Sequence, residues 1–98
     1  MLNLDDAQKQ EVIRFCKFFI PDAAVYIFGS RAKGTATPRS DLDIALESTN
    51  EIPYGKLMQL KDALNNSDLP FHIDVVNWQT IPPSFRAMNE KERILLSS

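Results

Sequence analysis

The sequence predicts a small α/β or α+β domain in which helices pack against a central β-sheet. Three stretches carry apolar residues at helical spacing, and three others are short apolar or alternating runs typical of strands. No repeat, linker or low-complexity tract separates them, so residues 1–98 are expected to form one domain with the order α-β-β-α-β-α. With 98 residues, of which 44% are hydrophobic, the chain is long enough to bury one core.

The first helix is expected over residues 3–19. Asn3 is placed to cap it, and apolar side chains recur at helical spacing: Val12, Phe15, Cys16 and Phe19. Pro21 ends the helix, and the five apolar residues 24–28 are too few for another helix and rich in strand formers. We therefore expect a first strand there, buried on both faces, and Cys16 as a small core residue.

The second strand is expected over residues 41–46, after a glycine-bearing connection at residues 29–40. The strand alternates with period two, and its apolar set faces the core: Leu42, Ile44 and Leu46. Asp41 and Asp43 therefore project together on the opposite side of the strand.

A second long helix is expected to begin at Pro53. One side of this helix carries Tyr54, Leu57, Met58, Lys61 and Leu64. A third strand is expected over residues 71–77, with His72 and Asp74 on one face. We expect His72 to be a partly exposed strand residue, with a contact to phosphate or acceptor as the alternative. Residues 82–83 then open a last helical region with four apolar contacts: Phe85, Met88, Ile94 and Leu95.

Charge and cysteine content narrow the classes of function. A net charge of −2 argues against a general nucleic-acid binder, so no direct nucleic-acid binding is expected. One cysteine allows no intramolecular disulfide, which favours a reducing compartment. Residues 1–10 are polar and acidic, unlike a signal peptide, and no apolar run is long enough to cross a membrane. We expect a soluble, cytoplasmic protein.

Three carboxylates are expected to converge if the second and third strands are neighbours. Asp74 would then lie beside Asp41 and Asp43, and like charges this close raise one another's pKa unless a cation lies among them. Ligation by oxygen alone suits Mg²⁺ or Mn²⁺. From these residues alone, the alternative is a turn at residues 40–41 followed by Asp43 on a solvated strand face.

The connection at residues 29–40 has the composition of an anion site. Gly29 can leave the sheet with positive φ, and the next residues can form the first turn of a short helix whose free N–H groups join the Ser30 hydroxyl. Arg31 and Lys33 add positive charge. An ordinary turn with exposed basic residues is the alternative. A phosphate cradle beside a carboxylate pair makes up the two halves of a metal-assisted phosphoryl-transfer site.

These residues together resemble a known family signature. Gly29-Ser30, ten intervening residues and then Asp-Leu-Asp at residues 41–43 are similar to the Gly-Ser-x10-Asp-x-Asp pattern of the DNA polymerase β-like nucleotidyltransferases. Asp74, within HIDVV, occupies the position of the family's third acidic residue. The small size resembles the minimal, MNT-type members.

The resemblance implies a nucleotidyltransferase fold with a mixed β-sheet, ATP as substrate and two divalent metal ions, Mg²⁺ or Mn²⁺. By that resemblance, Gly29 and Ser30 hold the β- and γ-phosphates, with the positive charge of Arg31 and Lys33 nearby. The implied metal ligands and catalytic residues are Asp41, Asp43 and Asp74. Asp74 also helps to deprotonate the acceptor hydroxyl.

The same resemblance implies an all-helical HEPN-domain protein as partner, AMP transfer to a tyrosine of that partner, and an antitoxin role. One alternative is a binding module that neutralises a HEPN ribonuclease by direct contact without catalysis. Another is transfer to a small molecule, as in the aminoglycoside nucleotidyltransferases. The 98 residues leave no room for the domain that grips the base in larger relatives. We therefore expect a partner protein to complete the site or base selectivity to be loose, and association into an oligomer fits such a site.

Overall fold

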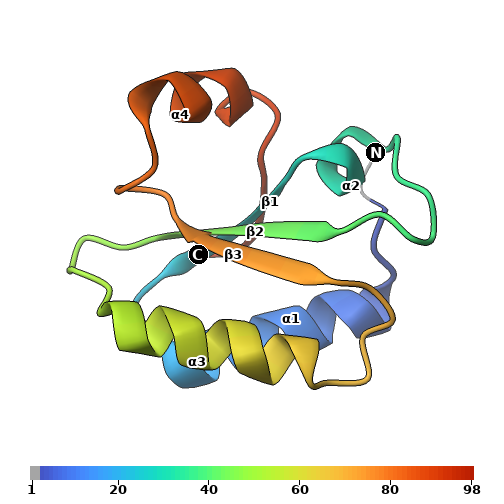
Figure 1. The fold of residues 1–98 in the computed structure, drawn as a ribbon, viewed down its shortest axis with the longest axis horizontal. Coiled ribbons are helices and arrows are strands. Elements are labelled where there is room, and N and C mark those ends of the chain that lie inside the picture. Colours follow the sequence, from blue (N-terminus) through green and yellow to red (C-terminus); the bar gives the residue numbers. More distant parts are fainter. Residues whose placement is uncertain (1–2) are drawn as a thin grey trace.

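The computed structural model describes residues 3–98 and consists of a four-stranded mixed sheet with helices on both faces (Figure 1). The elements in chain order are α1 (Asp6–Phe19), β1 (Ala24–Phe28), α2 (Ser30–Lys33), β2 (Leu42–Glu47), α3 (Tyr54–Asn65), β3 (Ile73–Asn77), α4 (Pro83–Asn89) and β4 (Ile94–Ser97). In Figure 1, α1 and α3 lie together below the sheet and α4 lies above it. The predicted fold class, a mixed sheet flanked by helices, is confirmed.

The sheet has the strand order β3-β2-β1-β4. β1 pairs antiparallel with β2 on one side and with β4 on the other, whereas β2 and β3 are parallel. A parallel pair needs a long crossover connection, which α3 supplies. In the resulting register Asp43 lies opposite Asp74, so the condition on which their predicted convergence depends, neighbouring second and third strands, is met.

The main core lies between the sheet and the helices α1 and α3. Alternate strand residues point into it and are fully buried, among them the predicted Leu42, Ile44 and Leu46. Helix α3 contributes Leu57, Leu60 and Leu64. Tyr54, predicted for the same apolar side, is instead 75% exposed, because it is the first residue of α3 and lies beyond the edge of the core.

Cys16 is fully buried in this core, as predicted. Burial raises the pKa of Cys16 to about 12, against the opposing effect of the positive charge of Lys17. We expect the thiol to resist a colorimetric thiol reagent in the native protein and to react once in denaturant. Because the unfolded thiol ionises near its usual pKa of 9.0, stability is expected to fall as the pH rises above that value. Rapid reaction of the native protein at neutral pH would contradict the buried, protonated state.

Helix α1 begins later than predicted. Asp5 rather than Asn3 is its N-cap, because Asp5 and Gln8 form a capping box in which each side chain accepts from the other's backbone N–H. Asn3 serves a different purpose. Its backbone N–H donates to the Arg31 carbonyl, and its side-chain oxygen accepts from the Ala36 N–H, so it ties the start of the chain to the connection before β2.

The carboxyl-terminal end also differs from the prediction. Ile94 and Leu95 belong to strand β4, whose Cα partners on β1 are Ile27 and Tyr26, and not to the last helix, which ends at Asn89. This short apolar run pairs with the edge of β1 as an antiparallel strand. The sequence could not distinguish a helix from a strand here, because the run is too short to show a periodicity.

Of the residues described, no helix is long and apolar enough to span a membrane.

Arg93 fixes the chain just before β4. Its guanidinium lies 3.9 Å from the centre of the Tyr26 ring and 4.5 Å from that of Trp78, and it donates to the Glu47 carboxylate over 3.1 Å. Trp78 is buried with a second, smaller apolar cluster on this face of the sheet, formed with Phe28 and Ala45. Both faces of β1 are therefore covered, although Tyr26 is only partly buried.

Candidate functional site

The site begins where β1 ends, at a glycine in a conformation that other residues rarely adopt. Gly29 has φ 74° and ψ −157°, as its predicted role in leaving the sheet requires. A Cβ atom placed on Gly29 would overlap the carboxylate oxygen Oδ2 of Asp43. The main chain of the turn therefore passes directly against the Asp43 carboxylate, and only glycine leaves room for both.

The predicted short helical turn is present as α2. The N–H groups of Ala32 and Lys33 both donate to the Gly29 carbonyl over 3.1 Å, and Gly34, with φ 79°, ends the turn. The amides of Ser30 and Arg31 open the helix and so have no acceptor within it. These amides and the half-buried Ser30 hydroxyl are the groups for which a phosphate contact is predicted, and this role stays a prediction.

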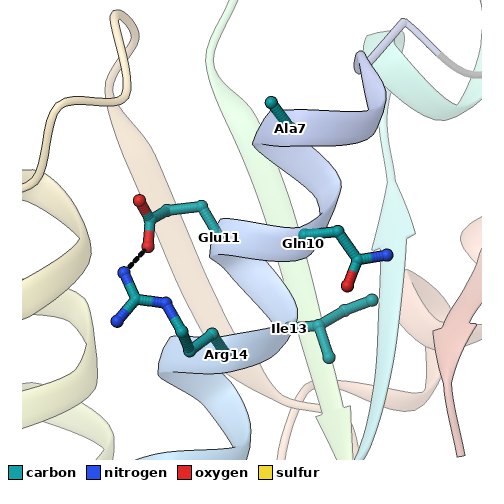
Figure 2. Close-up of a pocket in the computed structure, with 5 residues that line it drawn as sticks. All are labelled: Ala7, Gln10, Glu11, Ile13 and Arg14. Carbon is teal, nitrogen blue, oxygen red and sulfur yellow. Dashed lines mark hydrogen bonds and ion pairs between the residues drawn. The ribbon is translucent and has the colours of Figure 1, made fainter.

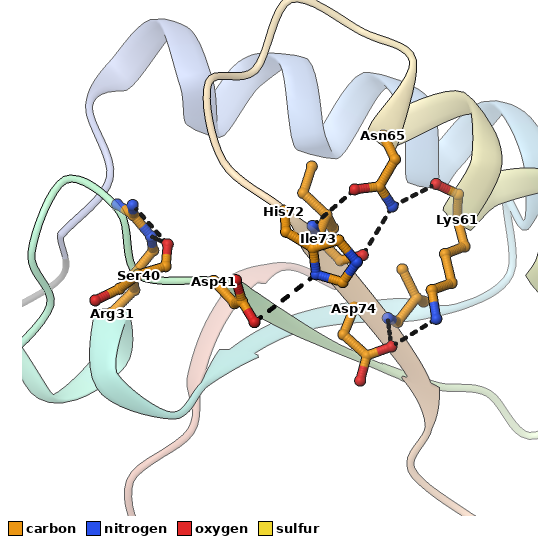
Figure 3. Close-up of polar contacts among 9 residues, drawn as sticks. Arg31, Ser40, Asp41, Lys61, Asn65, His72, Ile73 and Asp74 are labelled. Carbon is orange, nitrogen blue, oxygen red and sulfur yellow. Dashed lines mark hydrogen bonds and ion pairs between the residues drawn. The ribbon is translucent and has the colours of Figure 1, made fainter.

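Arg31, predicted to add positive charge near the turn, is buried with its guanidinium bound to main-chain carbonyls, and its predicted role in binding the nucleotide stays a prediction. Only 6% of its surface is exposed, and its guanidinium donates to the backbone carbonyl of Ser40 over 2.9 and 3.1 Å (Figure 3). It also donates to the backbone carbonyl of Asn3 over 2.9 Å. The same guanidinium lies 4.0 Å from the centre of the Phe71 ring. Arg31 holds the connection before β2 in place, because its donors are taken up by main-chain acceptors.

Lys33 lies on the surface at the end of α2. Its ammonium group forms an ion pair with the Glu92 carboxylate, 3.0 Å away, and both side chains are about half exposed. Glu92 belongs to the segment between α4 and β4, so this ion pair links α2 to that segment. Lys33 keeps a positive charge near the turn, partly neutralised by Glu92.

Asp43 and Asp74 lie opposite each other near the start of β2 and β3. Asp43 has Phe28 opposite it on β1 and Asp74 opposite it on β3. The pKa of Asp43 is raised, first by burial and then by the negative charges of Asp74 and Asp41, while His72 acts in the opposite direction. The Asp43 carboxylate is thus surrounded by more negative than positive charge.

Asp41 and Asp74 are each turned toward a basic side chain (Figure 3). Asp41, exposed just before β2, has Oδ2 at 3.8 Å from Nδ1 of the exposed His72. Asp74 has Oδ1 at 3.0 Å from the Lys61 ammonium. Within residues 3–98, no three His, Cys, Asp or Glu side chains are already gathered closely enough to hold a metal ion. The backbone brings Asp43 and Asp74 together, and their oxygens are not yet aimed at one point.

The chemistry of the donors nevertheless suits a hard divalent cation. Asp41, Asp43 and Asp74 offer only carboxylate oxygens, which Mg²⁺ and Mn²⁺ prefer. Burial and the neighbouring charges of Asp74 and Asp41 raise the pKa of Asp43, and a cation would relieve the repulsion among these charges. The residues present therefore fit such an ion: Asp74 offers the oxygen that Lys61 does not contact, and Asp41, now beside His72, is the ligand that must turn.

Lys61 is the residue of this site that the sequence did not indicate. The sequence feature that could have indicated it is a single lysine on the side of α3 that carries the buried leucines, because a charged side chain there needs a partner.

A distinct shallow hollow of about 330 Å³ lies along α1, lined by Ala7, Gln10, Glu11, Ile13 and Arg14 (Figure 2). It holds a Glu11–Arg14 ion pair and none of the predicted site residues.

Comparisons with known proteins agree with this fold. The probable protein adenylyltransferase MntA of Haemophilus influenzae is 38% identical over 77 residues, which cover 79% of this chain and 68% of MntA. A crystal structure of a toxin–antitoxin complex with AMP-PNP matches with a TM-score of 0.75 and 23% identity, over 90% of this chain and 71% of the other. The structure of a tri-AMPylated Shewanella oneidensis HEPN toxin with its MNT antitoxin matches with a TM-score of 0.71 and 20% identity, over 90% and 67%.

At these identities the two solved structures show the shared fold alone. The family is shown by the sequence relative and by a family model. The model of the polymerase beta nucleotidyltransferases matches residues 10–98, which is nearly the whole chain. The protein belongs to the polymerase β nucleotidyltransferase family.

Proposed function

We propose that this protein transfers AMP from ATP to a hydroxyl, that of a tyrosine, on a HEPN-domain partner and thereby acts as an antitoxin. Two comparisons support the proposal: the relative MntA is named as a protein adenylyltransferase, and a structure of the same fold contains an AMPylated HEPN toxin with an MNT antitoxin. A structure of this fold with AMP-PNP supports ATP as the donor. We place the reaction in the cytoplasm, whose reducing environment suits a chain with a single free cysteine.

The observation that carries the proposal is the pairing of β2 with β3. It sets Asp43 opposite Asp74, while Gly29 lies against the Asp43 carboxylate from the other side. Carboxylates and a glycine turn with free amides are thereby joined in one place, as transfer of a nucleotide requires. A protein that only bound its partner would have no need for paired carboxylates beside a glycine turn.

In the proposed site, the β- and γ-phosphates lie against the turn at Gly29. The amide and hydroxyl of Ser30 donate to their oxygens, and the missing side chain of Gly29 leaves room for the Asp43 carboxylate beside the turn. Lys33 adds positive charge from the end of the turn. Arg31 acts indirectly, because it fixes the connection that leads from this turn to the carboxylates.

Asp41, Asp43 and Asp74 would hold two divalent metal ions, Mg²⁺ or Mn²⁺, in the proposed active form. Such ions would supply positive charge that neutralises the phosphates and the charge that develops during transfer. Asp74 accepts the proton of the acceptor hydroxyl. The acceptor oxygen then forms a bond to the α-phosphorus, the bond from that phosphorus to the bridging oxygen breaks, and pyrophosphate leaves from the turn at Gly29.

The test is intact-mass spectrometry of the HEPN-domain partner after incubation with this protein, ATP and Mg²⁺. We expect a mass gain of one or more AMP units on the partner, mapped by fragmentation to a tyrosine. The matched control, Asp41→Asn/Asp43→Asn, is expected to give none. A stable complex without any mass gain would refute catalysis and favour neutralisation by contact, and AMP on a small-molecule hydroxyl instead would identify the second alternative.

A further inference from the structure

Asp74 is held in one orientation by a residue of helix α3. The Lys61 ammonium lies 3.0 Å from Oδ1 of Asp74, and the backbone N–H of Val75 donates to the same oxygen over 3.1 Å (Figure 3). The second oxygen, Oδ2, has no hydrogen-bond partner among the residues described. Oδ1 of Asp74 therefore has two partners, and Oδ2 is available to contact the acceptor hydroxyl.

The position of Lys61 is itself fixed by the end of its helix. Asn65, the last residue of α3, lies one turn further on and forms two hydrogen bonds with the backbone of Ile73. Its side-chain amide donates to the Ile73 carbonyl over 2.8 Å, and its side-chain oxygen accepts from the Ile73 N–H over 2.9 Å. The same amide donates to the Lys61 carbonyl over 2.9 Å. Since Asp74 directly follows Ile73, this clamp sets Lys61 beside Asp74.

We propose that Lys61 is a positioning residue that orients the Asp74 carboxylate toward the acceptor hydroxyl. The proposal rests on the proposed function and adds a member to its site. Lys61 spans the edge of the sheet, since β3 is an outer strand, and its aliphatic stem reaches from the α3 side to the face that carries Asp43 and Asp74.

The exposure of the ion pair separates this role from a purely structural one. The Lys61 and Asp74 side chains are 34% and 45% exposed, and ion pairs this accessible contribute little to folding because solvent screens them. If Lys61 served stability alone, its replacement would therefore change the free energy of unfolding only slightly. Partners that orient carboxylates at metal sites commonly affect activity about 10–100-fold. The effect of Lys61 is thus expected in the rate of transfer.

The experiment compares Lys61→Met, Lys61→Arg and the matched control Lys56→Met, which removes the same charge from an exposed position of the same helix. For Lys61→Met we expect kcat for AMP transfer to fall roughly 10–100-fold. The KM for ATP should stay unchanged, because the turn at Gly29 holds the nucleotide. Lys61→Arg should recover most of the rate and Lys56→Met should behave as wild type. An unchanged kcat in Lys61→Met, or an equal loss in Lys56→Met, would overturn the proposal.

Two further measurements identify the route of the effect. In an Asp74→Asn background, Lys61→Met should cause no additional loss of rate, because its target is already gone, and a full further loss would count against the proposal. The side-chain carboxyl ¹³C signal of Asp74, recorded without metal or ATP, should move in Lys61→Met and not in Lys56→Met. An unmoved signal overturns the proposal. Absence of AMP transfer by the wild type, with the signal moved, refutes only the proposed function.

Discussion

Replacing Asp43 with asparagine is expected to abolish AMP transfer and at the same time to raise the thermal stability of the protein. Losing a metal-binding carboxylate removes several kcal/mol of transition-state stabilisation, which corresponds to a loss of roughly 10³-fold or more in rate. The uncharged amide also removes the cost of burying a charge and the repulsion from Asp74 and Asp41, which together raise the pKa of Asp43 in the folded state. Removing such an active-site charge commonly adds about 0.5–2 kcal/mol of stability.

The stabilisation should depend on pH with a defined sign. Because folding raises the pKa of Asp43 above its usual 3.8, the folded state keeps this proton more tightly than the unfolded chain does. The residue therefore contributes stability at low pH that is lost as the pH rises through the folded pKa. Melting curves should show Asp43→Asn above wild type by a few degrees near neutral pH, and the gap should shrink in acid.

Asp68→Asn is the matched control, since Asp68 is exposed in the turn after α3 and its replacement should leave the melting temperature unchanged. A lower melting temperature for Asp43→Asn at neutral pH would show that Asp43 is instead stabilising. Full AMP transfer by the same variant would remove Asp43 from the proposed site.

Replacing Gly29 with alanine should impair both stability and activity. The new Cβ would overlap Oδ2 of Asp43, and an L-residue at φ 74° is strained by about 1–2 kcal/mol. The Asp43 carboxylate has to move to make room. A misplacement of about 1 Å can cost roughly 100-fold in rate, so transfer should fall by about that factor.

The matched control is Gly55→Ala. Nothing lies within 4 Å of a Cβ at Gly55, which is in the first turn of α3, so alanine there should be neutral or slightly stabilising. Thermal melting and initial rates of AMP transfer measure both variants. If Gly29→Ala kept the wild-type melting temperature and rate, the close approach of the turn to Asp43 would have no functional importance.

The backbone of the site could be predicted because it depends on local patterns. The alternation of apolar and polar residues along residues 41–46 predicted which side chains of β2 face the core. The same alternation in residues 71–77 predicted the third strand, which contains Asp74. Gly29 followed from the end of an apolar run. What remained conditional was the pairing of the two strands, because their parallel contact is made by residues about thirty positions apart.

Other features depended on contacts that no local pattern records. Arg31 and Lys33 look alike in the sequence, yet only Arg31 is buried, because the carbonyls of Asn3 and Ser40 and the Phe71 ring come together around it after folding. The strand containing Ile94 forms because β1 has a free edge. Lys61 meets Asp74 only once α3 has docked on β3.

The way Arg31 is held also affects how this protein can diverge. Its acceptors in the connection before β2 are backbone carbonyls, which every amino acid provides whatever its side chain. Exposed positions such as Thr35 and Arg39 can therefore change without altering the path of the chain. We expect this connection to tolerate substitution as long as Arg31 remains. Different exposed side chains can then be acquired next to the carboxylates during evolution while the carboxylates keep their positions.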